Sequence, residues 1–162
     1  VFDVSRLEPQ LACPSSVENV HPLPEVTARE KIRLDQGYLG SCTGGREEDI
    51  AVAAQILRGR HIAPYTRLVV VPASAEVMGS CMEKGYIQDL MQAGATVTAP
   101  GCGACLGVHQ GILASGEVCV SSTNRNFPGR MGAVDARIYL ASPATVAASL
   151  LNGYLTDPRG YC

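Results

Sequence analysis

Apolar and polar positions follow two different periods along most of the chain, and these periods predict helices and strands in turn. From Glu47 to Arg58, apolar residues recur on one helical face, and acidic residues occupy the first turn, where the helix dipole favours them. The β-branched run Arg67–Pro72 has the continuous apolar character of a strand buried on both faces. Further strands are predicted at 38–41, 95–98, 117–121 and 137–141, and further helices at 75–83, 86–93 and 143–151.

This alternation predicts an α/β fold, in the form of a three-layer α/β/α domain with a mostly parallel sheet. Residues 1–36 differ from the rest because they are rich in proline and weakly periodic. We expect them to form an extended lead-in packed on the domain, with one short strand around Leu11. The domain itself is then expected to occupy residues 37–162.

Composition narrows the classes of function. The chain is 46% hydrophobic and 17% charged, an ordinary globular balance, and its net charge of −2 predicts no partnership with nucleic acid or with an anionic membrane. No apolar run approaches the roughly 20 residues that cross a bilayer, and the first residues do not form a secretory signal. We therefore expect a location in the cytoplasm, or in an organelle matrix in a eukaryote. The absence of an initiator methionine predicts that an upstream segment has been lost.

Seven cysteines in 162 residues change this picture. A disulfide framework suits small secreted chains with thin cores, whereas here the number is odd and the composition supports a proper core. We therefore expect reduced thiols, some of which hold a metal.

Three of the cysteines lie in glycine-rich loops that follow predicted strands. Cys42 lies in GSCTGG (residues 40–45), and Cys102 and Cys105 lie in PGCGACLG (residues 100–107). Open α/β sheets bind ligands at the carboxyl ends of their strands, and helix amino termini stabilise thiolates. The C-x2-C pair also fits a dithiol redox pair or a zinc site with His109 as fourth ligand, and Cys42 alone fits a structural thiol. The cysteines by themselves leave these alternatives open.

Two arginines, Arg125 and Arg130, follow another predicted strand in TNRNFPGR (residues 123–130). A guanidinium fork binds a carboxylate through paired hydrogen bonds, so the two arginines suit a dicarboxylate or tricarboxylate substrate. The alternative is that both are surface residues of a turn.

In this order, the stretches GSCT (40–43), PGCGACLG (100–107), TNRNFPGR (123–130) and LASPAT (140–145) resemble the aconitase superfamily. They look most like the large subunits of 3-isopropylmalate dehydratases and homoaconitases. The resemblance runs from about Leu7 to Tyr161 and covers only the carboxyl-terminal, cluster-ligating domain of such a subunit.

The resemblance implies the fold of an aconitase iron–sulfur domain and hydro-lyase chemistry. The substrate would be a 2-hydroxy dicarboxylate, isopropylmalate first of all, which is isomerised by dehydration and rehydration. The alternatives are a homoaconitase-like, aconitase-like or other hydroxy-acid dehydratase, a cluster-carrying subunit without catalysis of its own, and a zinc-stabilised, non-catalytic binding module.

The resemblance also implies a cofactor and its ligands. A [4Fe–4S] cluster would be held by Cys42, Cys102 and Cys105, and three thiolates leave one iron open to substrate as a Lewis acid. On the same match, Arg125 and Arg130 would contact substrate carboxylates, and Asn124 would hydrogen-bond near the cluster. The positions that match no ligand are interpreted as structural: Cys13, Cys81, Cys119, Cys162, His61 and His109.

Other parts of the active site are implied to lie outside this chain. In the family, an amino-terminal region supplies Asp, His and Glu residues, and the catalytic base is a serine of a swivelling domain or small subunit. We therefore expect no catalytic base here, and we expect as partners the missing amino-terminal domains, the small subunit and a hydroxy dicarboxylate. One departure is Gly44, which stands where the family usually has asparagine and removes a side-chain amide near the cluster.

Overall fold

The computed structural model describes residues 3–161, and its centre is one seven-stranded sheet. The strands are Gln10–Ala12 (β1), Val20–Pro22 (β2), Gln36–Gly40 (β3), Arg67–Val71 (β4), Ala95–Val97 (β5), Val118–Ser121 (β6) and Arg137–Leu140 (β7). Their order across the sheet is β2-β1-β7-β6-β3-β4-β5. The strands from β7 to β5 are parallel, and β1 and β2 add an antiparallel edge. The predicted mostly parallel α/β architecture is confirmed.

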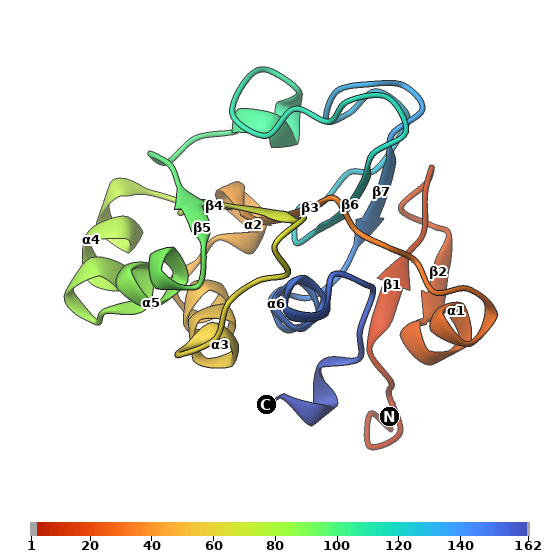
Figure 1. The fold of residues 1–162 in the computed structure, drawn as a ribbon, viewed down its shortest axis with the longest axis horizontal. Coiled ribbons are helices and arrows are strands. Elements are labelled where there is room, and N and C mark those ends of the chain that lie inside the picture. Colours follow the sequence, from red (N-terminus) through yellow and green to blue (C-terminus); the bar gives the residue numbers. More distant parts are fainter. Residues whose placement is uncertain (1–2, 162) are drawn as a thin grey trace.

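The helices cover mainly one face of this sheet. They are Leu23–Arg29 (α1), Ser41–Gly44 (α2), Glu47–Leu57 (α3), Ala75–Glu83 (α4), Tyr86–Gln92 (α5) and Pro143–Asn152 (α6), with 3-10 turns at Gly103–Leu106 (η1) and Pro158–Gly160 (η2). In Figure 1, α3, α5 and α6 lie below the strands, and the segment that contains η1 lies above them. The third layer of the predicted sandwich therefore consists of η1 and irregular chain in the part of the protein that the structure describes.

Two separate apolar cores lie on the two faces. The larger core lies between the sheet and the helices and includes Leu39, Ile50 and Leu150. The smaller core lies under the irregular segments and includes Leu113 and Met131. Across residues 3–161, no helix has the length and apolar character needed to cross a membrane.

Local sequence accounts for several helix ends. The Ser74 hydroxyl accepts a hydrogen bond of 3.2 Å from the Val77 amide at the start of α4, and Ser142 caps α6 in the same way through Thr145. Gly153 ends α6 with a φ of +73°, a conformation that glycine adopts without strain.

The lead-in contains more regular structure than expected. The strand near Leu11 is confirmed as β1, but residues 1–36 also include β2 and α1. Leu11 and Leu23 are fully buried in the larger core, so this segment packs on the sheet. The expectation of an otherwise extended segment was wrong at α1, because a proline in the first turn of a helix looks the same in sequence as a proline in extended chain. The domain boundary near residue 36 stays a prediction.

The path of the chain creates a switch point at the centre of the sheet. From β3 the chain moves outward to β4 and β5, and it then returns across the sheet to β6 and β7 on the other side of β3. The loops that follow β3 and β6 therefore leave in opposite directions from neighbouring strands. Open α/β sheets bind ligands at this kind of point.

Candidate functional site

The turn that carries Cys42 begins where β3 ends at the switch point. Gly40 has a φ of +132°, and a Cβ atom there would lie 2.0 Å from the carbonyl oxygen of Val71, so only glycine fits. The next residue, Ser41, is buried and also has a positive φ, of 64°. Cys42 follows in α2 with an exposed side chain.

Ser122, directly after β6, joins this turn to the neighbouring loop. Its hydroxyl accepts a hydrogen bond of 2.9 Å from the Gly40 amide and donates one of 3.0 Å to the Gly44 carbonyl. The two bonds lie on either side of Cys42. A Cβ atom on Gly44 would lie 2.1 Å from the Ser122 carbonyl oxygen. Gly44 is therefore required here by the close approach of the two loops.

The second thiol-bearing turn lies over the face of the sheet that the smaller core occupies. Cys102 is exposed and precedes η1, whereas Cys105 is buried within η1. The hydroxyl of Tyr38, on β3, donates a hydrogen bond of 2.8 Å to the Cys102 carbonyl. Burial raises the pKa of Tyr38 to about 12, so the hydroxyl keeps its proton at neutral pH.

The predicted substrate arginines lie in the loop after β6 in two different environments. Arg125 is exposed, and its guanidinium donates a hydrogen bond of 2.8 Å to the carbonyl of Asn124, whose side chain is also exposed. Arg130 is half-buried, and its guanidinium lies 5.5 Å from the centroid of the Phe127 ring. The Nε atom of Arg130 is buried and has no hydrogen-bond partner within the described residues.

Asn126, which the sequence did not single out, fixes this loop to the lead-in. It is only 2% exposed, and its side-chain amide donates to the carbonyls of Ala12, Cys13 and Ser16 at 3.4, 2.8 and 3.2 Å. These partners are 110 to 114 positions away in sequence. Asparagine in a polar loop is common, so no local signal could have identified this role.

The described residues form neither the alternative zinc site nor a gathered set of the three cysteines that are predicted to hold a cluster. Within residues 3–161, no three His, Cys, Asp or Glu side chains gather closely enough to hold a single metal ion. His109 is exposed, and its ring lies near the Gly103 position rather than completing a four-ligand site.

The other described cysteines are free thiols in apolar surroundings. Cys81 and Cys119 are fully buried, and burial raises the pKa of both thiols, that of Cys119 to about 12. Burial also raises the pKa of the half-buried Cys13 thiol. Such thiols are poor nucleophiles and poor ligands. Cys162 lies outside the described residues.

Comparison with known proteins identifies the family. Residues 1–153 match the model of the aconitase family (aconitate hydratase). The chain is 53% identical to the homoaconitase large subunit of Thermus thermophilus over 158 residues, which are 98% of this chain and 37% of that protein. It is also 53% identical over 160 residues to 3-isopropylmalate dehydratase large subunit 1 of Methanopyrus kandleri, covering 99% of this chain and 38% of that protein.

A third relative is the probable methanogen homoaconitase large subunit of Methanosarcina mazei, 51% identical over 98% of this chain and 39% of its own length. The chain thus spans less than two fifths of the curated relatives that it matches. The switch-point geometry, the family match and the three relatives agree, and the chain belongs to the aconitase family.

Proposed function

We propose that this chain is the cluster-ligating part of the large subunit of an iron–sulfur hydro-lyase. Residues 37–162 form the ligating unit in this proposal, and residues 1–36 pack on it. The observation that supports it is a set of hydrogen bonds that link the loops of the predicted site residues to one another or to strand β3. Ser122 bonds the Cys42 turn to the arginine loop, and Tyr38 bonds β3 to the Cys102 turn.

The donor set suits a cluster better than a single ion. Cys42, Cys102 and Cys105 come from two turns that are rich in glycine, where the backbone can approach a bulky inorganic group without Cβ clashes. Four ligands would complete an electron-transfer cluster, whereas three leave one iron open. When bound, such a cluster supplies a Lewis acid for a hydroxyl and a carboxylate of the substrate. We propose Asn124 as a hydrogen-bonding residue near it.

The residues of this chain would bind and orient the substrate. The buried Nε of Arg130 has no partner among the described residues, and a substrate carboxylate would satisfy it. Arg125 is exposed at the same loop and can fork a second carboxylate. We therefore propose a 2-hydroxy dicarboxylate as the substrate. Isopropylmalate is the first candidate, and the hydroxy acid of a homoaconitase is the alternative.

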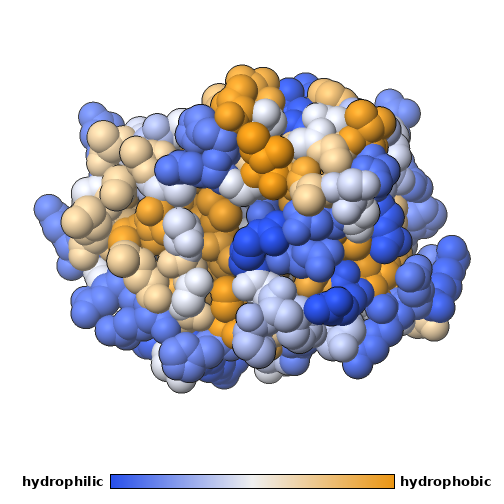
Figure 2. Space-filling view, turned by 45° about the horizontal axis from the view of Figure 1, so that its top comes forward, coloured by the Kyte–Doolittle hydropathy of each residue, from blue (hydrophilic) through white to orange (hydrophobic). Residues whose placement is uncertain are grey.

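The surface above the sheet supports a protein partner. Large apolar side chains are 46 to 74% exposed on the two irregular segments around the site: Leu106, Val108, Ile112, Phe127 and Val134. Backbone hydrogen bonds between Leu113 and residues 131 and 133 hold these segments side by side. Figure 2, in which the top of Figure 1 is turned forward, shows groups of hydrophobic atoms on this face between hydrophilic ones.

Exposed apolar surface of this kind is typical of protein interfaces. The matched relatives are more than twice as long as this chain and are named as large subunits. We propose that the amino-terminal part of such a large subunit covers this surface, that a small subunit completes the site with the catalytic base, and that the assembly works in the cytoplasm or an organelle matrix.

The experiment that tests the proposal is anaerobic reconstitution of the chain with iron and sulfide. We expect a brown protein with broad absorption near 400 nm, and a three-iron signal in electron paramagnetic resonance after mild oxidation, because one iron lacks a protein ligand. Serine at Cys42, Cys102 or Cys105 should each abolish the absorption, and Cys13→Ser is the matched control. A colourless protein that binds zinc, or a cluster that survives Cys42→Ser but not Cys13→Ser, would overturn the proposal.

A further inference from the structure

Strand β3 directs two polar side chains, Gln36 and Tyr38, toward the face that the segment 98–117 covers. Residues two apart on a strand point to the same face of a sheet. Both side chains are fully buried, and buried polar groups need hydrogen-bond partners. Each of them donates to a backbone carbonyl of this one segment.

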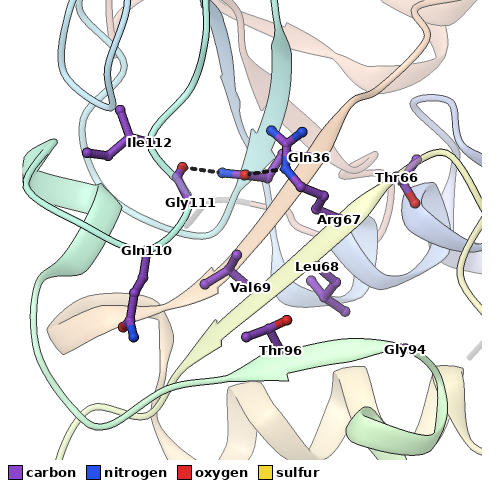
Figure 3. Close-up of a pocket in the computed structure, with 10 residues that line it drawn as sticks. All are labelled: Gln36, Thr66, Arg67, Leu68, Val69, Gly94, Thr96, Gln110, Gly111 and Ile112. Carbon is purple, nitrogen blue, oxygen red and sulfur yellow. Dashed lines mark hydrogen bonds between the residues drawn. The ribbon is translucent and has the colours of Figure 1, made fainter.

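The two hydrogen bonds lie on either side of the second thiol-bearing turn. Tyr38 donates to the carbonyl of Cys102 at 2.8 Å, where the turn begins. The Nε2 atom of Gln36 donates to the carbonyl of Gly111 at 2.7 Å, beyond the turn (Figure 3). The strand that ends in the Cys42 turn thus also holds the chain on both sides of Cys105.

A charged pair fixes the orientation of the Gln36 amide. The Nε atom of Arg67 donates to Gln36 Oε1 at 3.1 Å (Figure 3). The other two guanidinium nitrogens of Arg67 donate to both carboxylate oxygens of Glu117 at 2.8 and 2.7 Å. Because arginine can only donate, the amide oxygen must face Arg67 and the NH2 group must face Gly111. Gln36 is therefore pre-set as a donor to the segment.

The segment needs such anchors because it has little regular structure. Between β5 and β6 it contains only η1 as a named element, and Gly107, Gln110 and Gly111 have positive φ angles of 75°, 47° and 100°. Loops of this kind open locally at low free-energy cost. A cleft of about 450 Å³, lined by Gln36, Val69, Thr96 and residues 110–112 among others, adjoins the Gly111 anchor (Figure 3). If the Gln36 side chain were removed, water from this cleft would hydrogen-bond to the Gly111 carbonyl in its place, and water does not hold the segment to β3.

We propose that Gln36 and Tyr38 are positioning residues, which fix the Cys102–Cys105 turn relative to Cys42. The proposal rests on the proposed function only in naming a cluster as the group that this turn holds. Neither residue is among the proposed ligands or substrate-binding residues. Their effect is to keep two separate thiol-bearing turns at a constant separation.

The test uses Tyr38→Phe and Gln36→Leu, each with a matched control. Tyr139→Phe removes the hydroxyl of a buried tyrosine in the other core, and Ser149→Ala, in α6, removes a hydrogen bond of 3.0 Å from the Thr156 amide to a buried hydroxyl. In the cluster-free chain, both test variants should raise hydrogen exchange of residues 102–114 by about 3- to 10-fold, the factor that one lost hydrogen bond corresponds to. The controls should leave exchange in this segment unchanged.

In the reconstituted chain, the test variants should also lose their absorption near 400 nm faster in air than the controls. Wild-type exchange at residues 102–114 in both test variants would overturn the positioning role, and so would equal rates of cluster loss in test and control variants. If the wild-type chain takes up no cluster, the proposed function fails, and the exchange measurement still decides whether the two side chains hold the turn.

Discussion

At the residue scale, single side chains that both donate and accept hydrogen bonds hold the candidate site together. Ser122 uses its one hydroxyl both to accept from Gly40 and to donate to Gly44, and Gln36 uses both ends of its amide. Gly44 fits this scheme, because an asparagine there would bring its Cβ against the Ser122 carbonyl. Gly44 therefore allows the close contact between the two loops that this structure has.

Arg130 and Arg125 are predicted to bind substrate carboxylates through planar forks. Lysine keeps the charge and loses the fork, and charge-assisted hydrogen bonds contribute about 1.5–3 kcal/mol each. In the assembled enzyme, Arg130→Lys and Arg125→Lys should each lower kcat/KM by roughly 10- to 200-fold with normal iron content. Arg137→Lys, at the start of β7, is the control. Unchanged kinetics in both variants would show that these arginines are only surface residues.

Burial of the Cys119 thiol predicts how stability depends on pH. Burial raises the pKa of Cys119 from 9.0 to about 12, so the folded state holds its proton more tightly than the unfolded chain does. This contribution to stability is complete below pH 9 and is lost as pH rises toward 12. Urea unfolding in the presence of reductant should therefore show a falling free energy above pH 9, less steeply in Cys119→Ala. Equal slopes in both proteins would contradict this.

At the element scale, the positions at which helices and strands end decide where the candidate site residues lie. Each element of the parallel sheet that was predicted from periodicity is present, with ends that differ by at most two residues. The expected strand at 38–41 is shifted toward the amino terminus as β3, because Ser41 already belongs to α2. That shift places Cys42 in the first turn after the strand.

Gly79 and Gly40 should respond oppositely to replacement by alanine. Gly79 lies within α4, and a Cβ there meets nothing within 4 Å, so Gly79→Ala should stabilise the chain by about 0.5–1 kcal/mol. Gly40→Ala should destabilise it by more than that, because its Cβ would collide with the Val71 carbonyl. Thermal unfolding of the two variants measures both signs. A stabilised Gly40→Ala chain would refute the assigned turn geometry.

At the scale of the whole molecule, the two apolar cores differ in size and in the elements that they hold together. The larger core lies under the helices, on the face opposite η1, and it includes buried residues from the lead-in, the central strands and α6. The thiol-bearing turns belong to the edge and to the smaller core. Folding of the sheet is therefore expected to be independent of any bound group.

Chelation of iron from the reconstituted chain should leave the sheet intact. Far-ultraviolet circular dichroism should change little, and amides of β3, β4 and α6 should stay protected from hydrogen exchange, because the larger core remains packed. Residues 40–46 and 100–108 should exchange faster than in the loaded chain, at rates that the Gln36 and Tyr38 hydrogen bonds still limit in the second segment. Rapid exchange throughout the cluster-free chain would show instead that metal binding drives folding, as it does in small metal-stapled domains.

The sequence alone predicted the parallel α/β architecture and most element boundaries, and its motifs carried the resemblance that implied the family and the candidate ligands. These features are local, since helix and strand periods, capping serines and glycine-rich cysteine turns lie within short windows of chain. α1 escaped prediction because seven residues that begin beside a proline carry too short a period to distinguish a helix from extended chain.

The tertiary structure alone decided which side chains hold the candidate site. Tyr38 bonds to Cys102 across 64 positions, Ser122 to Gly40 across 82, and Asn126 to Cys13 across 113. Such bonds depend on strand order and on the crossing of the segment 98–117 over the sheet. Neither of these can be predicted from local periodicity. A buried tyrosine, serine or glutamine in a strand looks the same in sequence whether it anchors a distant loop or fills a core, because its partner is chosen by the fold.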